Sequence, residues 1–596
     1  MKRNDIKEED KWDVNNIYKN DAVWNITFKE LQEDVEKIIQ FKGTLKDSAL
    51  SIQKMYEYKV NLHSKIEKLL IYSHMKKDED TKNDIYRSLY DKTENLLTRY
   101  NELTSWIIPE LMAISNEKIN HFINSDELID YKFDIIRILR EKSNTLTENE
   151  EKILSLSNLP LSAISDAFSA LNNADIVFPR IKNKHGEDKD LTHSQYLSYL
   201  HSNDRILREN AWKTYHKKFS EYSTTFSVLL QGEVRNHAFN SKVRSFSSSL
   251  EASLFKDNID VTVYTNLIKT VRENISSLHK YMKYRKQKLK VETLHVYDLY
   301  VSFIEYENIQ INYNDAKEKI LESVKLLGNE YHQVLSNGLN SERWVDIYEN
   351  ENKRSGAYST GGYLTKPFIL LNYNNTLDAA RTLAHEAGHS MHSYMTNKYQ
   401  HPIYSGYPIF LAEVASTFNE ELFNDYLLNT TDNKKFKAYI LNSMIEDIRG
   451  TLFRQTIFAE FELFIHRLIE EGTPLSAELL NTKYIELNKF YYGETLEIDE
   501  ELGIEWARIP HFYYNFYVYK YATGIAAAIS LFKKVKNGTE IEINQYLNFL
   551  KAGNSKYPLD ILKDAGIDMS TPEPIINAIR HFDFLLEELK KIEGDI

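Results

Sequence analysis

The stretch TLDAARTLAHEAGHSMHSYM, residues 376–395, decides the fold expected around it. Its Ala and Leu residues favour an α-helix, and Asp378 near the start suits a helix N-terminus. On a helix, His385 and His389 are four residues apart and therefore one turn apart on the same face. Two imidazoles in this arrangement can bind one tetrahedral Zn²⁺ at about 2.0 to 2.1 Å.

Glu386 follows the first of these histidines and adds a candidate general base. Its carboxylate can take a proton from water that attacks a carbonyl group, and can then pass the proton to the leaving amine. This is the chemistry of peptide hydrolysis. The alternative is an ordinary amphipathic helix that carries two histidines. Gly388 favours the first interpretation, because a glycine inside a helix indicates the close approach of another element or of a substrate.

Glu413 is the candidate for the third protein ligand that a catalytic zinc site needs. It lies in an apolar stretch between Leu411 and Ala415, where a carboxylate requires a partner. The alternative is a buried salt bridge. Glu420 falls on the same helical face as Glu413 and is expected to orient a ligand. His392 shares the face of the two HEAGH histidines, and we expect it behind the ligands or facing substrate rather than on the metal.

The segment IPHFYYNFYVYKYAT, residues 509–523, places five tyrosines after one histidine. If the segment is helical, Tyr514, Tyr517 and Tyr521 share one face, and its other tyrosines point elsewhere. Phenol and imidazole groups on one face can donate hydrogen bonds to a developing oxyanion. We therefore take His511 and this tyrosine face as candidate catalytic groups. The alternative is a core aromatic cluster in a protein with 40 Tyr.

The composition predicts a globular, mainly α-helical protein. Of its 596 residues 42% are hydrophobic, and only 11 are Pro and 19 Gly. A formal charge of -13 and the lack of a dense Lys/Arg run argue against a nucleic-acid partner. The sequence has no Cys, so His and carboxylates must hold any metal. It has no signal-peptide pattern and no apolar stretch of membrane-spanning length, so we expect no membrane partner and a cytoplasmic location.

Helical patterns cover most of the N-terminal third. Apolar residues recur with a helical period over residues 28–39, and Thr27 with Glu30 forms a capping-box pattern. Similar amphipathic segments run through residues 52–142. Another runs from Thr147, the start of a second capping-box pattern, to about residue 172.

Strand signals are few and local. The segment DIVFPRIKNKHGEDKDL, residues 175–191, predicts a short hairpin around its HG turn, ahead of a capping box at Thr192. Helical periodicity resumes over residues 192–345. Glycines and the run PFILLNY then make residues 354–374 the best candidate for a small sheet, and helical signals return from Asn375.

Several motifs together resemble the oligoendopeptidase F family, whose members are relatives of thimet oligopeptidase. They are HEAGH at 385–389, AEVAST at 412–417, IPHFYYNFYVYKYATG at 509–524, GAYSTGG at 356–362, LHVYDLY at 294–300 and DAGIDMSTPEP at 564–574. The resemblance runs over most of the chain. It implies a mainly α, zincin-like metallopeptidase with two helical lobes around a deep substrate channel and a small β-sheet near the active site. It also implies internal cleavage of short peptides.

The resemblance assigns roles by position. It implies one Zn²⁺ per chain, held by His385, His389 and Glu413, with Glu386 as general base. The groups that bind the substrate carbonyl correspond to His511, Tyr514 and Tyr521, and the spacing leaves Tyr517 as a substitute for either tyrosine. The GAYS segment corresponds to an edge strand that pairs with bound peptide.

The resemblance also divides the chain into two regions and leaves two other functions to exclude. Residues 1–190 correspond to an N-terminal helical region and residues 191–596 to the catalytic region with HEAGH. One other function is a helical peptide-binding scaffold with a purely structural zinc, which would need a fourth protein ligand. The other is a zinc hydrolase of non-peptide amides.

Overall fold

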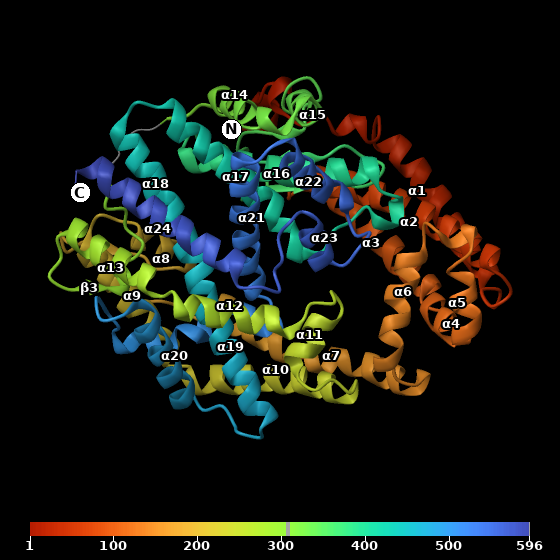
Figure 1. Cartoon of the computed structure of the whole chain (residues 1–596), viewed down its shortest axis with the longest axis horizontal. Coiled ribbons are helices and arrows are strands. Elements are labelled where there is room, and N and C mark those ends of the chain that lie inside the picture. The colour runs from red at the N-terminus through yellow and green to blue at the C-terminus, as the bar shows by residue number, and fades with distance from the viewer. Residues whose placement is uncertain (305–309, 595–596) are drawn as a thin grey trace. The chain divides into compact units, whose positions relative to one another are not determined.

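Helices dominate the architecture, as the composition predicts (Figure 1). The computed structural model describes residues 1–594 except 305–309. Residues 305–309 of the predicted helical stretch 192–345 lie outside the described residues. Residues 305–309 and 595–596 of the predicted catalytic region 191–596 do so as well. In the described part of the chain, no helix is both long enough and apolar enough to cross a membrane.

The chain forms two compact units, each assembled from segments that are distant in sequence. The first unit comprises Met1–Ser143, Asn308–Thr430 and Ala528–Ile567. Its helices are α1 (Asp21–Glu36), α2 (Ala49–Glu79), α3 (Asp84–Thr104), α4 (Ile107–Ala113), α5 (Asn116–Phe122), α6 (Lys132–Glu141), α14 (Tyr313–Ser323), α15 (Asn329–Leu339), α16 (Leu377–Tyr399), α17 (Ile409–Thr430), α22 (Glu540–Ala552) and α23 (Pro558–Asp564). Its strands are β4 (Val345–Asp346), β5 (Tyr358–Thr360) and β6 (Phe368–Leu370).

The second unit comprises Asn144–Glu307, Thr431–Ala527 and Asp568–Ile596. Its helices are α7 (Glu148–Ala170), α8 (His193–Leu200), α9 (Arg205–Ser220), α10 (Ser223–Val243), α11 (Ser249–Phe255), α12 (Val261–Glu273), α13 (Ser276–Leu289), α18 (Lys434–Ile448), α19 (Arg454–Glu470), α20 (Ala477–Tyr492) and α24 (Glu573–Glu593). Its strands are β1 (Ile181–Lys182), β2 (Asp188–Lys189), β3 (Leu294–His295) and β7 (Leu496–Glu497). Helix α21 (Tyr519–Asn537) begins in the second unit and ends in the first.

The first helix starts earlier than the sequence pattern predicts. The side chain of Asn20 caps α1 by accepting a hydrogen bond from the N–H of Val23 at 3.1 Å. The predicted capping box of Thr27 and Glu30 is wrong, because Thr27 lies inside the helix and its hydroxyl donates to the carbonyl of Val23. The apolar face extends one turn toward the N-terminus through the fully buried Trp24, so the helix continues past the predicted cap.

Two other predicted helix starts are found. Thr147 and Glu150 form the reciprocal capping box of α7. Thr192 caps α8 by accepting from the N–H of Gln195 at 3.2 Å. The Gln195 carboxamide oxygen has no hydrogen-bond partner among the described residues, so only half of that box forms.

Strands are short, and the predicted small sheet is present in the first unit. Its order is β4-β6-β5, with β6 parallel to β4 and antiparallel to β5. The register pairs Ser359 of β5 with Ile369 of β6. In the second unit β1 and β2 form the predicted antiparallel hairpin, whose turn contains Gly186 at φ +78°. Strands β3 and β7 pair in parallel there.

The small sheet is anchored in the hydrophobic core of the first unit. Phe368 and Leu370 of β6 belong to the same buried cluster as Trp24 and residues of α2. The ring of Trp12 meets Phe368 edge to face, with centroids 6.4 Å apart. Because β6 is fixed in the core, it holds β5 at the edge of the sheet, where β5 packs against α16.

Candidate metal centre and aromatic cluster

The HEAGH motif lies on α16, as predicted. Thr376 caps this helix by accepting from the N–H of Ala379 at 3.1 Å, and Asp378 lies in the first turn. Ala384 and Ala387 are buried on the inner face, and the motif histidines retain partial exposure. The helix therefore buries its alanine face while it presents His385 and His389 to the adjoining pocket.

Gly388 allows α17 to pack directly against α16. A Cβ atom placed on Gly388 would lie 2.7 Å from the carbonyl oxygen of Ala415 and 2.7 Å from the Cα of Ser416. Both atoms belong to the backbone of α17, so a side chain at Gly388 would push the two helices apart. The close approach predicted from this glycine is confirmed, and the approaching element is the helix that carries Glu413.

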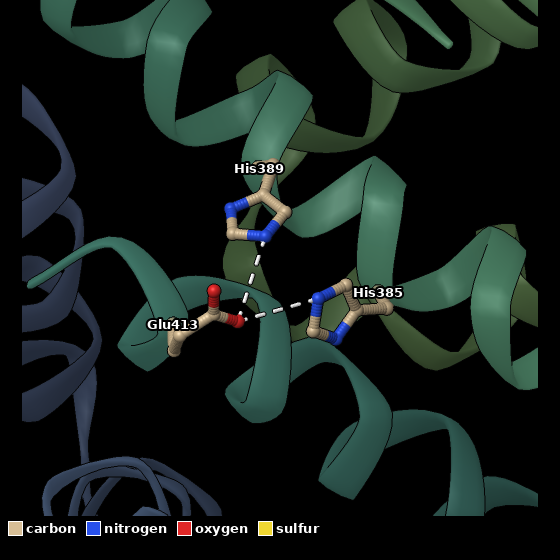
Figure 2. A group of neighbouring side chains, drawn as sticks. All are labelled: His385, His389 and Glu413. Atoms are coloured by element: carbon tan, nitrogen blue, oxygen red, sulfur yellow. Dashed lines mark ion pairs between the residues drawn. The ribbon is translucent and has the colours of Figure 1, made fainter. Parts of the chain in front are cut away.

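His385, His389 and Glu413 converge at one point (Figure 2). Oε2 of Glu413 is 3.4 Å from Nε2 of His385 and 3.7 Å from Nε2 of His389. One candidate ligand atom from each residue lies within 4.8 Å of the other two. Tetrahedral Zn²⁺ with bonds of about 2.0 to 2.1 Å would separate its ligand atoms by about 3.3 Å. Two nitrogens and one carboxylate oxygen at these separations fit a zinc ion.

Glu420 orients the first histidine, as predicted. Nδ1 of His385 donates to Oε1 of Glu420 at 2.7 Å, and Arg381 pairs with the other carboxylate oxygen at 3.2 Å. The hydrogen bond at Nδ1 leaves Nε2 of His385 facing Glu413. Carboxylate partners of this kind fix the ring orientation of metal-ligating histidines.

The two histidines have opposite electrostatic environments. Burial would lower the pKa of His385, but the hydrogen bonds to Glu413 and Glu420 outweigh it and raise that pKa to about 10. Burial and the neighbouring charge of His385 lower the pKa of His389 to about 4. The hydrogen bond from His385 lowers the pKa of Glu413. The carboxylate of Glu413 therefore stays ionised beside the two imidazole rings.

Glu386 is buried beside the cluster. Burial raises its pKa to about 7, the charge of His385 opposes the shift, and the backbone N–H of Ser359 hydrogen-bonds its carboxylate. Ser359 belongs to the edge strand β5, and its hydroxyl also hydrogen-bonds Ser390 of α16 at 2.9 Å. A carboxyl group poised near neutral pH is suited to proton transfer.

A pocket of about 320 Å³ opens onto these side chains. Its lining residues come from β5 and the segment before it, from α16, from α17 and from the segment before α17; they are Ala357, Tyr358, Ser359, His385, Glu386, His389, Ser393, Tyr407 and Glu413. The pocket therefore joins the edge of the sheet to the candidate metal ligands and to Glu386.

His392 is packed behind this pocket. It is almost fully buried, and its ring stacks on Tyr407 with centroids 3.8 Å apart. The hydroxyl of Tyr407 in turn hydrogen-bonds Ser393 at 3.0 Å. His392 is not in the group of candidate ligands. His392 therefore packs against the pocket wall, through Tyr407.

His511 and the predicted tyrosines cluster in the second unit, but not on one helix. A 3-10 turn, η13 (Pro510–Tyr513), is followed by a loop, and α21 starts only at Tyr519. The helical interpretation of the segment is therefore wrong. The rings nevertheless meet, because the His511 centroid lies 5.6 Å from Tyr514, 6.0 Å from Tyr517 and 5.8 Å from Tyr521.

This aromatic cluster has hydrogen-bonding groups on its surface. Nε2 of His511 lies 3.3 Å from the hydroxyl of Tyr521. Tyr514 is 55% exposed. The other tyrosines of the segment have packing roles, since Tyr513 stacks on Phe168 with centroids 4.2 Å apart and Tyr519 is buried. The segment thus contains both an open cluster and part of the core.

Comparison with known proteins assigns the family. A model of peptidase family M3 matches residues 198–581, and a model of oligopeptidase F matches residues 110–178. The chain belongs to peptidase family M3. Oligopeptidase PepF of Bacillus subtilis is 42% identical to it over 591 residues, which are 99% of this chain and 88% of that protein. The resemblance to oligoendopeptidase F is thus confirmed, and the chain is an M3 metallopeptidase.

Solved structures confirm the fold of the family for this chain. A protein from Chlamydophila abortus has a TM-score of 0.94 and 38% identity, covering 99% of this chain and 100% of that one. Oligoendopeptidase F of Enterococcus faecium has a TM-score of 0.74 and 36% identity, covering 97% of this chain and 100% of that one. The mainly helical M3 peptidase fold with small sheets follows from both matches.

Sequence reasoning missed some residues that line this pocket or support its side chains. Ser393 lies four residues after His389, on the same helical face, so helical spacing could have found it. Tyr407 precedes α17 in a loop, and no local pattern marks it. Arg381, the partner of Glu420, lies four residues before His385, so helical spacing could have found it as well. The contact of the Ser359 amide with Glu386 could not be predicted without knowing how β5 pairs in the sheet.

Proposed function

We propose that this protein is a zinc-dependent oligoendopeptidase that hydrolyses internal bonds of short peptides, with one Zn²⁺ per chain held by His385, His389 and Glu413. The observation that carries the proposal is the buried carboxyl of Glu386 beside these three converging side chains, in a pocket that reaches the edge strand β5. Three protein ligands leave a coordination position open, as in catalytic rather than structural zinc sites.

Glu386 is the proposed general base. A zinc ion bound at this site supplies a Lewis acid that polarises the peptide carbonyl and lowers the pKa of water. Glu386 accepts the proton of the attacking water and returns it to the departing amine. Burial raises the pKa of Glu386 to about 7, which suits a group that must accept and release a proton in one cycle.

His511, Tyr514 and Tyr521 are the proposed donors to the carbonyl oxygen of the scissile bond, with Tyr517 as the substitute for either tyrosine. Their ring contacts and the exposure of Tyr514 support the proposal. Hydrogen bonds from phenol and imidazole groups stabilise the negative charge that develops on this oxygen.

A short peptide is proposed to bind along β5. The strand lies at the edge of its sheet, and the backbone of Ser359 already reaches Glu386. Addition of a peptide strand there would align its backbone with the general base.

We also propose that the chain divides into an N-terminal region, 1–190, and a catalytic region, 191–596. We further propose that it has no nucleic-acid partner and that it is located in the cytoplasm.

The substitution Glu386→Gln tests the mechanism. Glutamine preserves size but cannot accept the proton of water at neutral pH, so turnover of short peptides should fall by about 10² to 10⁴. The three metal ligands are untouched, so zinc content should equal that of the wild type. Peptide cleavage measured by mass spectrometry, with zinc content by elemental analysis, checks both. Substantial residual peptidase activity in a zinc-replete Glu386→Gln protein contradicts the proposal.

A mixed peptide library tests the substrate class. Short unstructured peptides should be cut internally, and a chelator should stop the cleavage. Trimming only from peptide ends, or cleavage that survives zinc removal, would point to a different activity.

A further inference from the structure

Two consecutive residues in the loop before α21 adopt left-handed backbone conformations. Asn515 has φ +47° and Phe516 has φ +60°. This region suits glycine but is costly for a bulky side chain, because Cβ approaches the neighbouring carbonyl oxygen. Such a conformation persists only where the surrounding structure holds it.

Glu462 of α19 holds the backbone of the turn. The N–H of Phe516 donates to Oε1 of Glu462 at 2.6 Å. Glu462 is fully buried, and its Oε2 has no hydrogen-bond partner in the described part of the chain. An apolar side chain would fill this position without the cost of burying a carboxyl group. The Phe516 amide is thus the contact that accounts for an acid here.

The ring of Phe516 is fixed as well as its amide. It is 1% exposed. It packs on the imidazole of His466 with centroids 4.3 Å apart and meets the ring of Tyr264 edge to face at 5.5 Å. Both neighbours belong to helices of the second unit, α19 and α12. The turn is therefore held against these helices by one hydrogen bond and two ring contacts.

The turn stands between two members of the aromatic cluster. Tyr514 precedes Asn515, and Tyr517 follows Phe516. Tyr514 is half exposed, so packing does little to fix the direction of its side chain. The backbone conformation of the turn therefore sets this direction. A change of the turn to right-handed φ values would redirect both tyrosines away from His511.

We propose that Glu462 is a positioning residue for this cluster: its hydrogen bond fixes the left-handed turn, and the turn directs Tyr514 and Tyr517 toward His511. The inference rests on the proposed role of the cluster as donor to the substrate carbonyl. Glu462 lies behind Phe516 and acts only through the backbone. Burial raises its pKa to about 8 against the opposing hydrogen bond of Phe516, so glutamine is a matched neutral acceptor.

The test compares three variants with the wild-type enzyme. Glu462→Leu removes the acceptor and Glu462→Gln keeps it. Ile465→Ala opens a cavity at a fully buried position of the same helix and keeps both the Glu462 carboxyl and the His466 ring. Amide hydrogen exchange of a fragment spanning residues 514–518 reports the turn directly. Peptide kinetics give kcat and KM, thermal unfolding gives stability, and zinc content controls for the metal site.

We expect faster exchange in Glu462→Leu and a kcat lower by about 10- to 100-fold, with a smaller change in KM, since misplaced catalytic groups act mainly on turnover. Glu462→Gln should restore both values. Ile465→Ala should lower the unfolding temperature and leave kcat unchanged. If the leucine variant does not fold, Glu462→Asp, whose carboxylate is one methylene too short to reach the amide, should show the same loss.

Two outcomes overturn the inference: unchanged exchange in the variants that lack the acceptor, or faster exchange with full kcat. Tyr514→Phe and Tyr521→Phe separate this failure from failure of the proposed function. If both phenylalanine variants also keep full kcat, the cluster does not serve the reaction. If they lose turnover while Glu462→Leu and Glu462→Asp do not, only the positioning role is wrong.

Discussion

The two histidines of HEAGH differ because, among the described residues, a carboxylate bonds Nδ1 of His385 but not Nδ1 of His389. Glu420 accepts a hydrogen bond from Nδ1 of His385. Burial and the charge on His385 lower the pKa of His389. The same residue type on the same helical face thus has a raised pKa at one position and a lowered pKa at the other. Orientation by Glu420 therefore distinguishes His385 as the more rigidly held of the two candidate ligands.

A single hydroxyl should matter at the aromatic cluster. Tyr514→Phe or Tyr521→Phe removes a donor with little change in volume, so kcat should fall by about 10² to 10³. Affinity for the peptide should change less, because the donor acts on charge that develops during reaction. Steady-state kinetics on a short peptide measure both quantities. Wild-type turnover in both variants would show that the cluster is core packing.

The buried carboxyl of Glu462 should make stability depend on pH. Its pKa is about 8 in the folded protein, above the ordinary value of 4.5, so the folded state binds the proton more tightly. Stability relative to Glu462→Gln should be highest below pH 4.5. It should fall by up to about 1.4 kcal/mol per pH unit as pH rises toward 8.

Neighbouring groups do not obscure this pH dependence. Burial lowers the pKa of His466 to about 3 and keeps the pKa of Tyr264 well above its ordinary value, so both stay uncharged in the folded protein in this window. His466 does titrate in the unfolded chain, but it is present in both proteins, so its contribution cancels in the difference. Urea unfolding of both proteins at several pH values measures the difference. A difference in stability that does not vary between pH 5 and 8 would show that Glu462 is ionised in the folded protein.

At the level of elements, the contact between α16 and α17 builds the candidate metal centre. The first helix carries both histidines and Glu386, and the second carries Glu413 and Glu420. Because Gly388 has no side chain, the backbone of α17 approaches at Ala415 and Ser416. The distance between the histidines and Glu413 therefore depends on a glycine that binds nothing itself.

Gly388→Ala should weaken both the fold and the metal site. Alanine gains about 1 kcal/mol of helix propensity, but overpacking against the backbone of α17 costs typically about 1 to 3 kcal/mol. We expect a lower unfolding temperature and weaker zinc retention. Gly450→Ala is the matched control, since a Cβ there meets nothing within 4 Å. Equal stability and zinc content in the two variants would contradict this account.

At the scale of the whole molecule, the candidate metal centre and the aromatic cluster belong to different compact units. All three candidate metal ligands and Glu386 belong to the first unit, and His511 with its tyrosines belongs to the second. Each unit is assembled from three stretches of chain. A local change in one unit should therefore leave the other largely intact.

Removal of zinc should loosen the first unit selectively. Without the metal, the contact between the helices, the ion pairs and the hydrogen bond from Ser416 still hold Glu413, but the metal bonds are lost, so amide exchange should accelerate in α16 and α17. Exchange in α19 of the second unit should stay near its original rate. Exchange followed by mass spectrometry before and after chelation measures this. Equal acceleration in both units would mean that they unfold together.

The sequence alone determined the helical class and the metal-binding chemistry. Helical period places His385, His389 and Glu386 on one helix whatever the remainder does, and the absence of cysteine restricts the ligands to imidazole and carboxylate. Glu413 and Glu420 could be predicted from the sequence, because an acidic residue in an apolar helix needs a partner. The spacing of residues along a helix and the polarity of their neighbours depend on the local sequence alone, so folding of the rest of the chain does not change them.

Only the tertiary structure decided what distant segments bring together. The amide of Ser359 meets Glu386 through a strand pairing, Gly388 admits α17, and Glu462 holds a left-handed turn that replaced the helix expected for His511 to Tyr521. Helical spacing could not foresee that turn. A buried acceptor more than 50 residues away in sequence stabilises a backbone conformation that local propensity alone disfavours, and this stabilisation exists only once α19 and the loop have packed.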